Sequence, residues 1–63
     1  MVREAFMKLA IAMIKLDLNV NDSNQVQIAF DTLSLRHKLC LKHYLSDVGY
    51  KHFKSRLINT INN

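Results

Sequence analysis

Apolar residues recur along most of the 63-residue chain at steps of three and four, the spacing of one face of an α-helix. One stripe of this kind runs through residues 2–20 and a second through residues 24–45. The chain has no proline and one glycine, so little interrupts these stripes. The pattern predicts an all-α fold. The stripe residues are Val2, Phe6, Leu9, Met13, Leu16 and Val20, and then Val26, Phe30, Leu33, His37, Cys40 and Tyr44.

Two short segments separate the expected helices. Asn21–Asn24 consists of residues that favour turns and caps, and Gln25 follows Asp22 at the spacing of a capping box. Ser46–Gly49 forms a second break, because glycine takes a positive φ readily. An apolar face then resumes and ends near Ile61.

We therefore expect one compact three-helix domain over residues 1–63, with helices at about 2–20, 24–45 and 48–61. The first two would form an antiparallel hairpin, and the third would be a basic amphipathic helix. Asp31, Thr32 and Ser34 also favour caps. A break of the second helix near Thr32 is therefore an open alternative.

The first two helices carry more apolar residues than one neighbouring helix covers. A chain of this length buries only about 60% of its unfolded surface, so the core is small without a partner. The surplus predicts a homodimer, or an interface for a partner's helix. The predicted interface residues are Met7, Ile11, Ile14 and Leu18 in the first helix and Leu35 and Leu39 in the second.

Charge is distributed unevenly within a net charge of +4. Residues 1–31 carry three basic and four acidic side chains, whereas residues 32–63 carry six basic ones and Asp47 alone. Arginine and asparagine suit base edges and lysine suits phosphates, so the basic half predicts a nucleic-acid surface. Residues 44–59 also have the outline of a helix-turn-helix around Gly49, although Ser55 stands where an apolar residue is usual. The candidate nucleic-acid residues are Lys38, Lys42, Lys51, His52, Lys54, Ser55, Arg56 and Asn59. The spacing of His52, Ser55, Arg56 and Asn59 predicts one outward face of the third helix.

The stretch RHKLCLKHY, residues 36–44, holds two histidines and the only cysteine. His37 and Cys40 lie one helical turn apart, the minimum geometry for a metal site or a thiolate–imidazole pair. On a helix, however, His43 is turned about 120° from His37. We interpret Cys40 as a small hydrophobe in the core and His37 as a core histidine with a polar partner, and we expect no bound metal or cofactor.

No paired carboxylates, phosphate loop or nucleophile–base set indicates an enzyme or a small-molecule substrate. The longest apolar run, residues 9–14, is far shorter than the roughly 20 residues of a membrane span. One cysteine fits a reducing, cytoplasmic setting. We expect a small cytoplasmic nucleic-acid-binding regulator, DNA more than RNA. The alternative is a protein-interaction module, such as an adaptor, inhibitor or assembly factor, that binds a partner helix.

Overall fold

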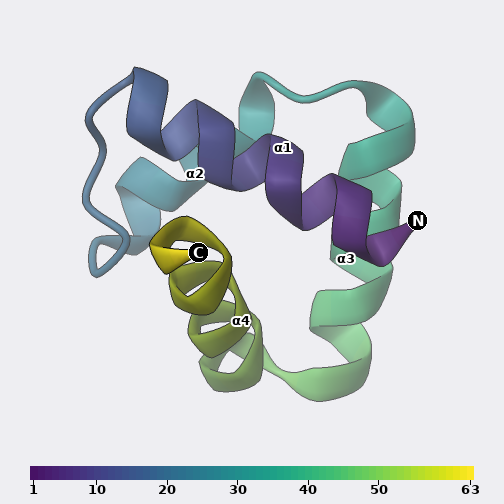
Figure 1. Cartoon of the computed structure of the whole chain (residues 1–63). Helices are drawn as coiled ribbons and strands as arrows, with labels where there is room; N and C mark the ends of the chain where they lie inside the picture. The colour runs from purple at the N-terminus through teal and green to yellow at the C-terminus, as the bar shows by residue number, and fades with distance from the viewer.

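The computed structural model describes all 63 residues and contains four helices and no strand. The helices are α1 (Val2–Lys15), α2 (Ser23–Asp31), α3 (Leu35–Val48) and α4 (Tyr50–Asn62) (Figure 1). The prediction of an all-α fold is confirmed. In Figure 1, α1 lies across the other helices, and it packs against each of them. By contrast, α2 packs on α1 and makes almost no contact with α3 or α4.

The expected continuous helix over residues 24–45 is instead two helices, which corrects the three-helix arrangement. The Thr32 hydroxyl donates a hydrogen bond to the Ala29 carbonyl at 2.7 Å and closes the end of α2. Ser34 is extended, and its side-chain oxygen caps α3 by accepting a bond from the His37 amide at 3.4 Å. These short polar side chains compete with the helical backbone for hydrogen bonds, so the helix breaks. The open alternative near Thr32 is the one observed.

The first helix ends at Lys15 rather than near residue 20. Asp17 has a φ of 54°, and its amide donates to the Ile14 carbonyl at 3.1 Å. The Leu18 amide donates to the Met13 carbonyl at 2.9 Å. This pair of bonds around a left-handed residue is a Schellman motif, which satisfies the last carbonyls of the helix. The turn redirects Leu18 to pack against the core.

The other helix ends follow the expected turn residues. Asp22 caps α2, since its carboxylate accepts a hydrogen bond from the Asn24 amide at 2.9 Å. The Gln25 side chain bonds to this carboxylate and to the Asn19 amide. Gly49, with φ 86° and ψ 161°, is the only residue between α3 and α4. This one-residue corner is shorter than the three to four residues of a typical helix-turn-helix turn.

The core contains ten buried residues, and α1 supplies half of them. Phe6 is at its centre: its ring centroid lies 5.3 Å from that of Tyr44 on α3 and 5.1 Å from that of Phe53 on α4. Aromatic pairs at these distances add to the stabilisation from burial. One aromatic side chain thus joins three helices. The buried residues are Ala5, Phe6, Leu9, Ala10, Met13, Val26, Ala29, Leu41, Phe53 and Leu57.

Candidate partner-binding groove and cationic surface

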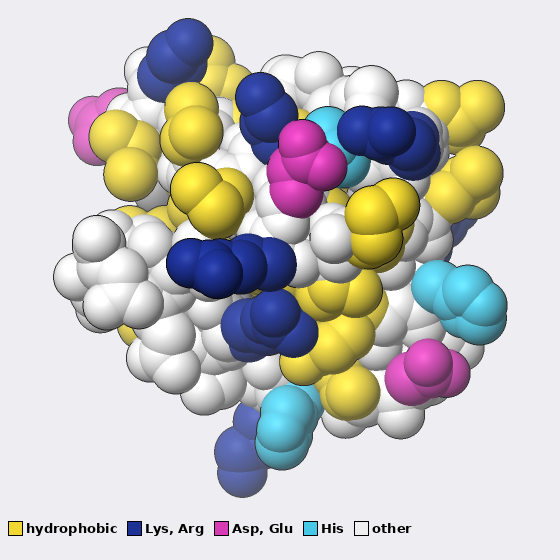
Figure 2. Space-filling view, turned by 45° about the vertical axis from the view of Figure 1, so that its right-hand side comes forward, with side chains coloured by type: hydrophobic (Ala, Val, Ile, Leu, Met, Phe, Trp, Pro, Cys, Tyr) yellow, Lys and Arg dark blue, Asp and Glu magenta, His cyan; other side chains and the backbone are white.

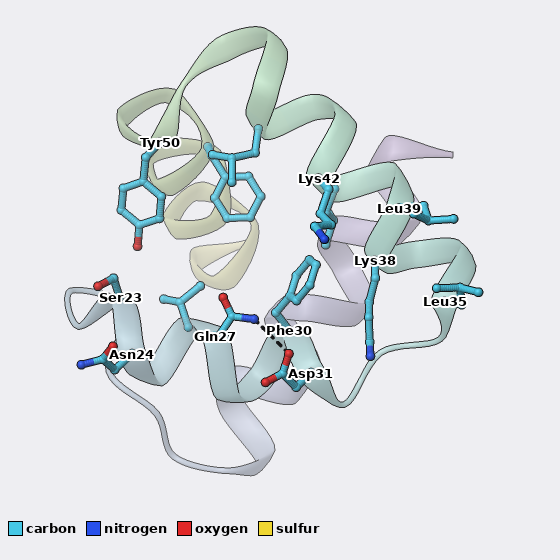
Figure 3. A pocket seen from close by; sticks show the side chains of 14 residues that line it. Ser23, Asn24, Gln27, Phe30, Asp31, Leu35, Lys38, Leu39, Lys42 and Tyr50 are labelled. Atoms are coloured by element: carbon cyan, nitrogen blue, oxygen red, sulfur yellow. Dashed lines mark hydrogen bonds between the residues drawn. The ribbon is translucent and has the colours of Figure 1, made fainter.

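A groove of about 640 Å³ separates α2 from α3 and α4, which we call the α2/α3 groove (Figure 3). It exists because α2 is held by α1 and is not closed against α3 or α4. Eight of its 14 lining residues are hydrophobic. The hydrophobic lining consists of Val26, Phe30, Leu35, Leu39, Leu41, Leu45, Tyr50 and Phe53, and the polar lining of Ser23, Asn24, Gln27, Asp31, Lys38 and Lys42.

The apolar lining forms two rows with helical spacing. Val26 and Phe30 are four residues apart on α2, as are Leu41 and Leu45 on α3. Rows at this spacing are the ridges between which the side chains of another helix pack. Val26 and Leu41 are buried, so Phe30 and Leu45, both half-buried, are the members of these rows that a bound helix could contact.

The polar side chains of the groove differ between its two walls. On α3, Lys38 and Lys42 lie one turn apart, and neither takes part in an ion pair. On α2, Gln27 donates a hydrogen bond to Asp31 at 2.9 Å, drawn as a dashed line in Figure 3. The Asp31 carboxylate keeps its negative charge in this bond, so the groove lining carries two positive charges on α3 and one negative charge on α2.

The predicted interface residues fall into three groups. Met7, Ile11 and Ile14 remain exposed on α1, with Ile14 61% exposed, and we call them the α1 strip. Leu35 and Leu39 are exposed on α3 and line the groove. Leu18 does not join the α1 strip, because α1 ends before it and it packs on the core.

The eight predicted nucleic-acid residues do not share one surface. The groove contains Lys38 and Lys42, while Lys51, Lys54, Ser55 and Asn59 line a separate shallow depression on α4. His52 is exposed and lines neither. The face drawn in Figure 2 also has its Lys and Arg side chains spread out, with hydrophobic side chains between them. These positive charges are dispersed.

Arg56 occupies a position that its spacing on α4 did not predict. Its guanidinium carbon lies 5.0 Å from the ring centroid of Phe6 and 5.2 Å from that of Tyr44. Both distances are within the range of a cation–π interaction. Arg56 is half-buried and lines a small hollow shared with Arg3 of α1. It therefore faces α1 rather than the outward face with His52.

The RHKLCLKHY segment does not gather metal ligands, since no group of three or more His, Cys, Asp or Glu side chains lies close enough to hold an ion. His37 is 13% exposed in its side chain; its Nδ1 is 3.1 Å from the Ser34 hydroxyl and its Nε2 is 3.7 Å from a Glu4 carboxylate oxygen. Cys40 is half-buried against the core. His37 and Cys40 thus lie on the core side of α3, whereas Lys38, Leu39 and Lys42 line the groove.

Sequence reasoning missed Leu41, Leu45 and Arg3. The expected stripe of the second helix ran unbroken through Thr32, so the break shifted the inward face of α3 toward Leu41 and Leu45. The four-residue spacing of these leucines was the available signal. Arg3 lies at the start of α1 and meets Arg56 only in the folded chain.

None of the four helices is both long enough and apolar enough to cross a membrane. In comparisons with known proteins, no family model matches this chain, and neither a curated protein nor a solved structure is significantly similar to it.

Proposed function

We propose that the protein is an interaction module whose α2/α3 groove binds an amphipathic helix of another protein. The observation that carries this proposal is the open apolar groove with Lys38 and Lys42 on one wall. An amphipathic helix that buries its apolar face in such a groove gains affinity from the hydrophobic contact. The lysine pair adds charge selectivity, and we therefore expect the partner helix to carry acidic side chains beside its apolar face.

The charge of the groove also argues against a second copy of α1 as its occupant. The α1 strip is flanked by Lys8 and Lys15, both exposed. Binding of this strip in the groove would bring these lysines toward Lys38 and Lys42, and like charges across an interface oppose association. An acidic amphipathic helix meets two opposite charges on α3 and one like charge, Asp31, on α2, so the balance of charge favours it.

The test uses two synthetic amphipathic peptides with the same leucine face, one flanked by glutamates and the other by lysines. We expect the acidic peptide to bind, and the Lys38→Glu/Lys42→Glu variant to prefer the basic peptide. The matched control is Lys51→Glu/Lys54→Glu, which changes the net charge equally but lies outside the groove. NMR shift changes should concentrate on Leu39 and Leu45, which line the groove and are not buried. A preference that reverses equally in both variants would refute the proposal.

Nucleic-acid binding is the second candidate. It is favoured because the protein's acidic side chains neutralise few of its basic ones. Of the nine lysines and arginines, only Arg36 forms an ion pair, at 3.7 Å from Glu4. Affinity for mixed-sequence DNA and RNA should then fall steeply between two salt concentrations, with a slope that counts the phosphates neutralised. The Lys38→Ala/Lys42→Ala/Arg56→Ala variant should bind more weakly. Absence of binding at low salt would remove this candidate.

Homodimerisation through the α1 strip accompanies either function. Three exposed apolar side chains in one row on α1 would gain from contact with their own copy across a two-fold axis. Sedimentation velocity tests this directly. We expect Ile11→Asp/Ile14→Asp to convert dimer to monomer, and Ile28→Asp, at an exposed position on α2, to leave the dimer intact. A wild-type monomer at high concentration would exclude the dimer.

A further inference from the structure

Two arginines from distant parts of the sequence line one hollow of about 290 Å³ between α1 and α4. Arg3 is exposed in the first turn of α1, and Arg56 is half-buried in α4. The other lining residues are Phe6, Met7, Thr60 and Asn63. No Asp or Glu side chain lines the hollow, and the terminal carboxylate of Asn63 forms no ion pair with either arginine.

The Arg56 guanidinium is held in place without using its hydrogen bonds. The rings of Phe6 and Tyr44 support it at 5.0 and 5.2 Å. It makes no hydrogen bond to another group of the chain and no ion pair, whether to an acidic side chain or to the chain terminus. Its N–H donors are therefore free, and a guanidinium fixed by stacking loses little conformational entropy when it binds an anion.

The charge of the two arginines indicates the kind of anion that fits. Thr60 contributes no donor, because its hydroxyl already donates to the Arg56 carbonyl at 2.8 Å. The two arginine side chains supply +2, matched by a terminal phosphate, which carries −1.5 to about −2 near neutral pH. A backbone phosphodiester carries only about −1. Arginine pairs are the side chains best shaped to bind phosphate oxygens.

We infer that the hollow between Arg3 and Arg56 is a binding site for a terminal phosphate, either inorganic phosphate or a small phosphate monoester. The site is separate from the α2/α3 groove, with which it shares no lining residue. Arg56 would bind the anion from a fixed position, and the exposed Arg3 would close on it from α1.

The experiment titrates the folded protein with inorganic phosphate, methyl phosphate and dimethyl phosphate at constant ionic strength, and follows the arginine Nε–H resonances by NMR. We expect phosphate or methyl phosphate to move the Arg3 and Arg56 signals, and dimethyl phosphate to bind about tenfold more weakly because it has lost one charge. If inorganic phosphate binds more tightly than methyl phosphate, the ligand is free phosphate; if methyl phosphate binds more tightly, the ligand is a phosphate monoester. Equal binding of dimethyl phosphate, or binding of oligonucleotides alone, would overturn the inference.

Arg3→Gln provides the variant test, because Arg3 is exposed and its replacement leaves the core unchanged. Its matched control is Lys8→Gln, which removes the same charge from an exposed position of α1 outside the hollow. We expect Arg3→Gln to weaken phosphate binding about tenfold and Lys8→Gln to change it less than about twofold. Arg56→Lys, which keeps the charge and loses the planar fork, should also weaken binding. If Arg3→Gln and Lys8→Gln weakened phosphate binding equally, the binding would depend only on the overall surface charge. That result would refute the proposed site.

Discussion

Replacement of Gly49 by alanine isolates the energetic cost of one backbone conformation. Gly49 ends α3 and begins α4, with φ 86° and ψ 161°. Apart from its two chain neighbours, no atom lies within 4 Å of a Cβ built on this residue, so Gly49→Ala introduces no steric clash with the rest of the chain. Any loss of stability must therefore come from the conformation itself, a region of φ and ψ that is essentially restricted to glycine.

The expected loss follows from two opposing contributions. A residue with a side chain in this region costs about 1–3 kcal/mol. Alanine also restricts the unfolded chain, which offsets about 0.4–1 kcal/mol. We expect a net loss of about 1–2 kcal/mol against a total stability of roughly 3–9 kcal/mol for a chain of this length. The Tm should fall by about 4–8 °C for each kcal/mol lost.

Thermal and urea denaturation followed by far-UV circular dichroism measures this loss. Asn59→Ala, at an exposed position of α4, is the control and should match or slightly exceed the wild type, because alanine favours helix. A synthetic chain with D-alanine at position 49 should recover most of the stability, since a D-residue favours positive φ. A Gly49→Ala variant as stable as the wild type, or equal destabilisation by both alanine enantiomers, would refute a conformational cost at position 49.

Three further changes test the core and the helix ends, each by the same denaturation measurements. Phe6→Ala should cost about 3–5 kcal/mol and leave much of the chain unfolded at 25 °C, because Phe6 packs on Tyr44 and Phe53; a Tm within a few degrees of wild type would contradict its central role. Asp17→Gly should stabilise by about 0.5–1 kcal/mol, because it relieves the positive φ of 54°; a loss of stability would argue against the Schellman turn. Asp22→Ala should cost about 1 kcal/mol through loss of the α2 cap, whereas Asp22→Asn, which retains a capping oxygen, should cost less.

The helical content, the buried face of α1 and the corner at Gly49 were predictable, because they depend on local spacing and on single residues. Phe6, Leu9 and Met13 are buried as their periodicity predicts. The helix ends were less predictable. A stripe that continues at steps of three and four through Thr32 looks like one helix, and the competing side-chain hydrogen bonds of Thr32 and Ser34 become decisive only when the two halves pack in different directions.

The residues of the candidate sites were predictable only on helices whose buried face was predicted correctly. Leu35 and Leu39 were identified as surplus apolar residues, and they line the groove. Arg56 was assigned to an outward face because its spacing matches Ser55 and Asn59. Its long side chain instead folds back over two aromatic rings, and the partner ring of Phe6 comes from a segment fifty residues away. No local pattern contains that contact.

The packing of α2 mainly against α1 has a mechanical consequence for the groove. A nine-residue helix is too short to persist by itself in water, so α2 keeps its shape only while its inner side rests on α1. Its amides should exchange with solvent through an opening that costs less free energy than global unfolding. The α2 wall of the groove would then move, while the opposite wall, formed by α3 and α4 on either side of Gly49, stays fixed. The groove would then widen or narrow on the α2 side to fit bound helices of different diameter.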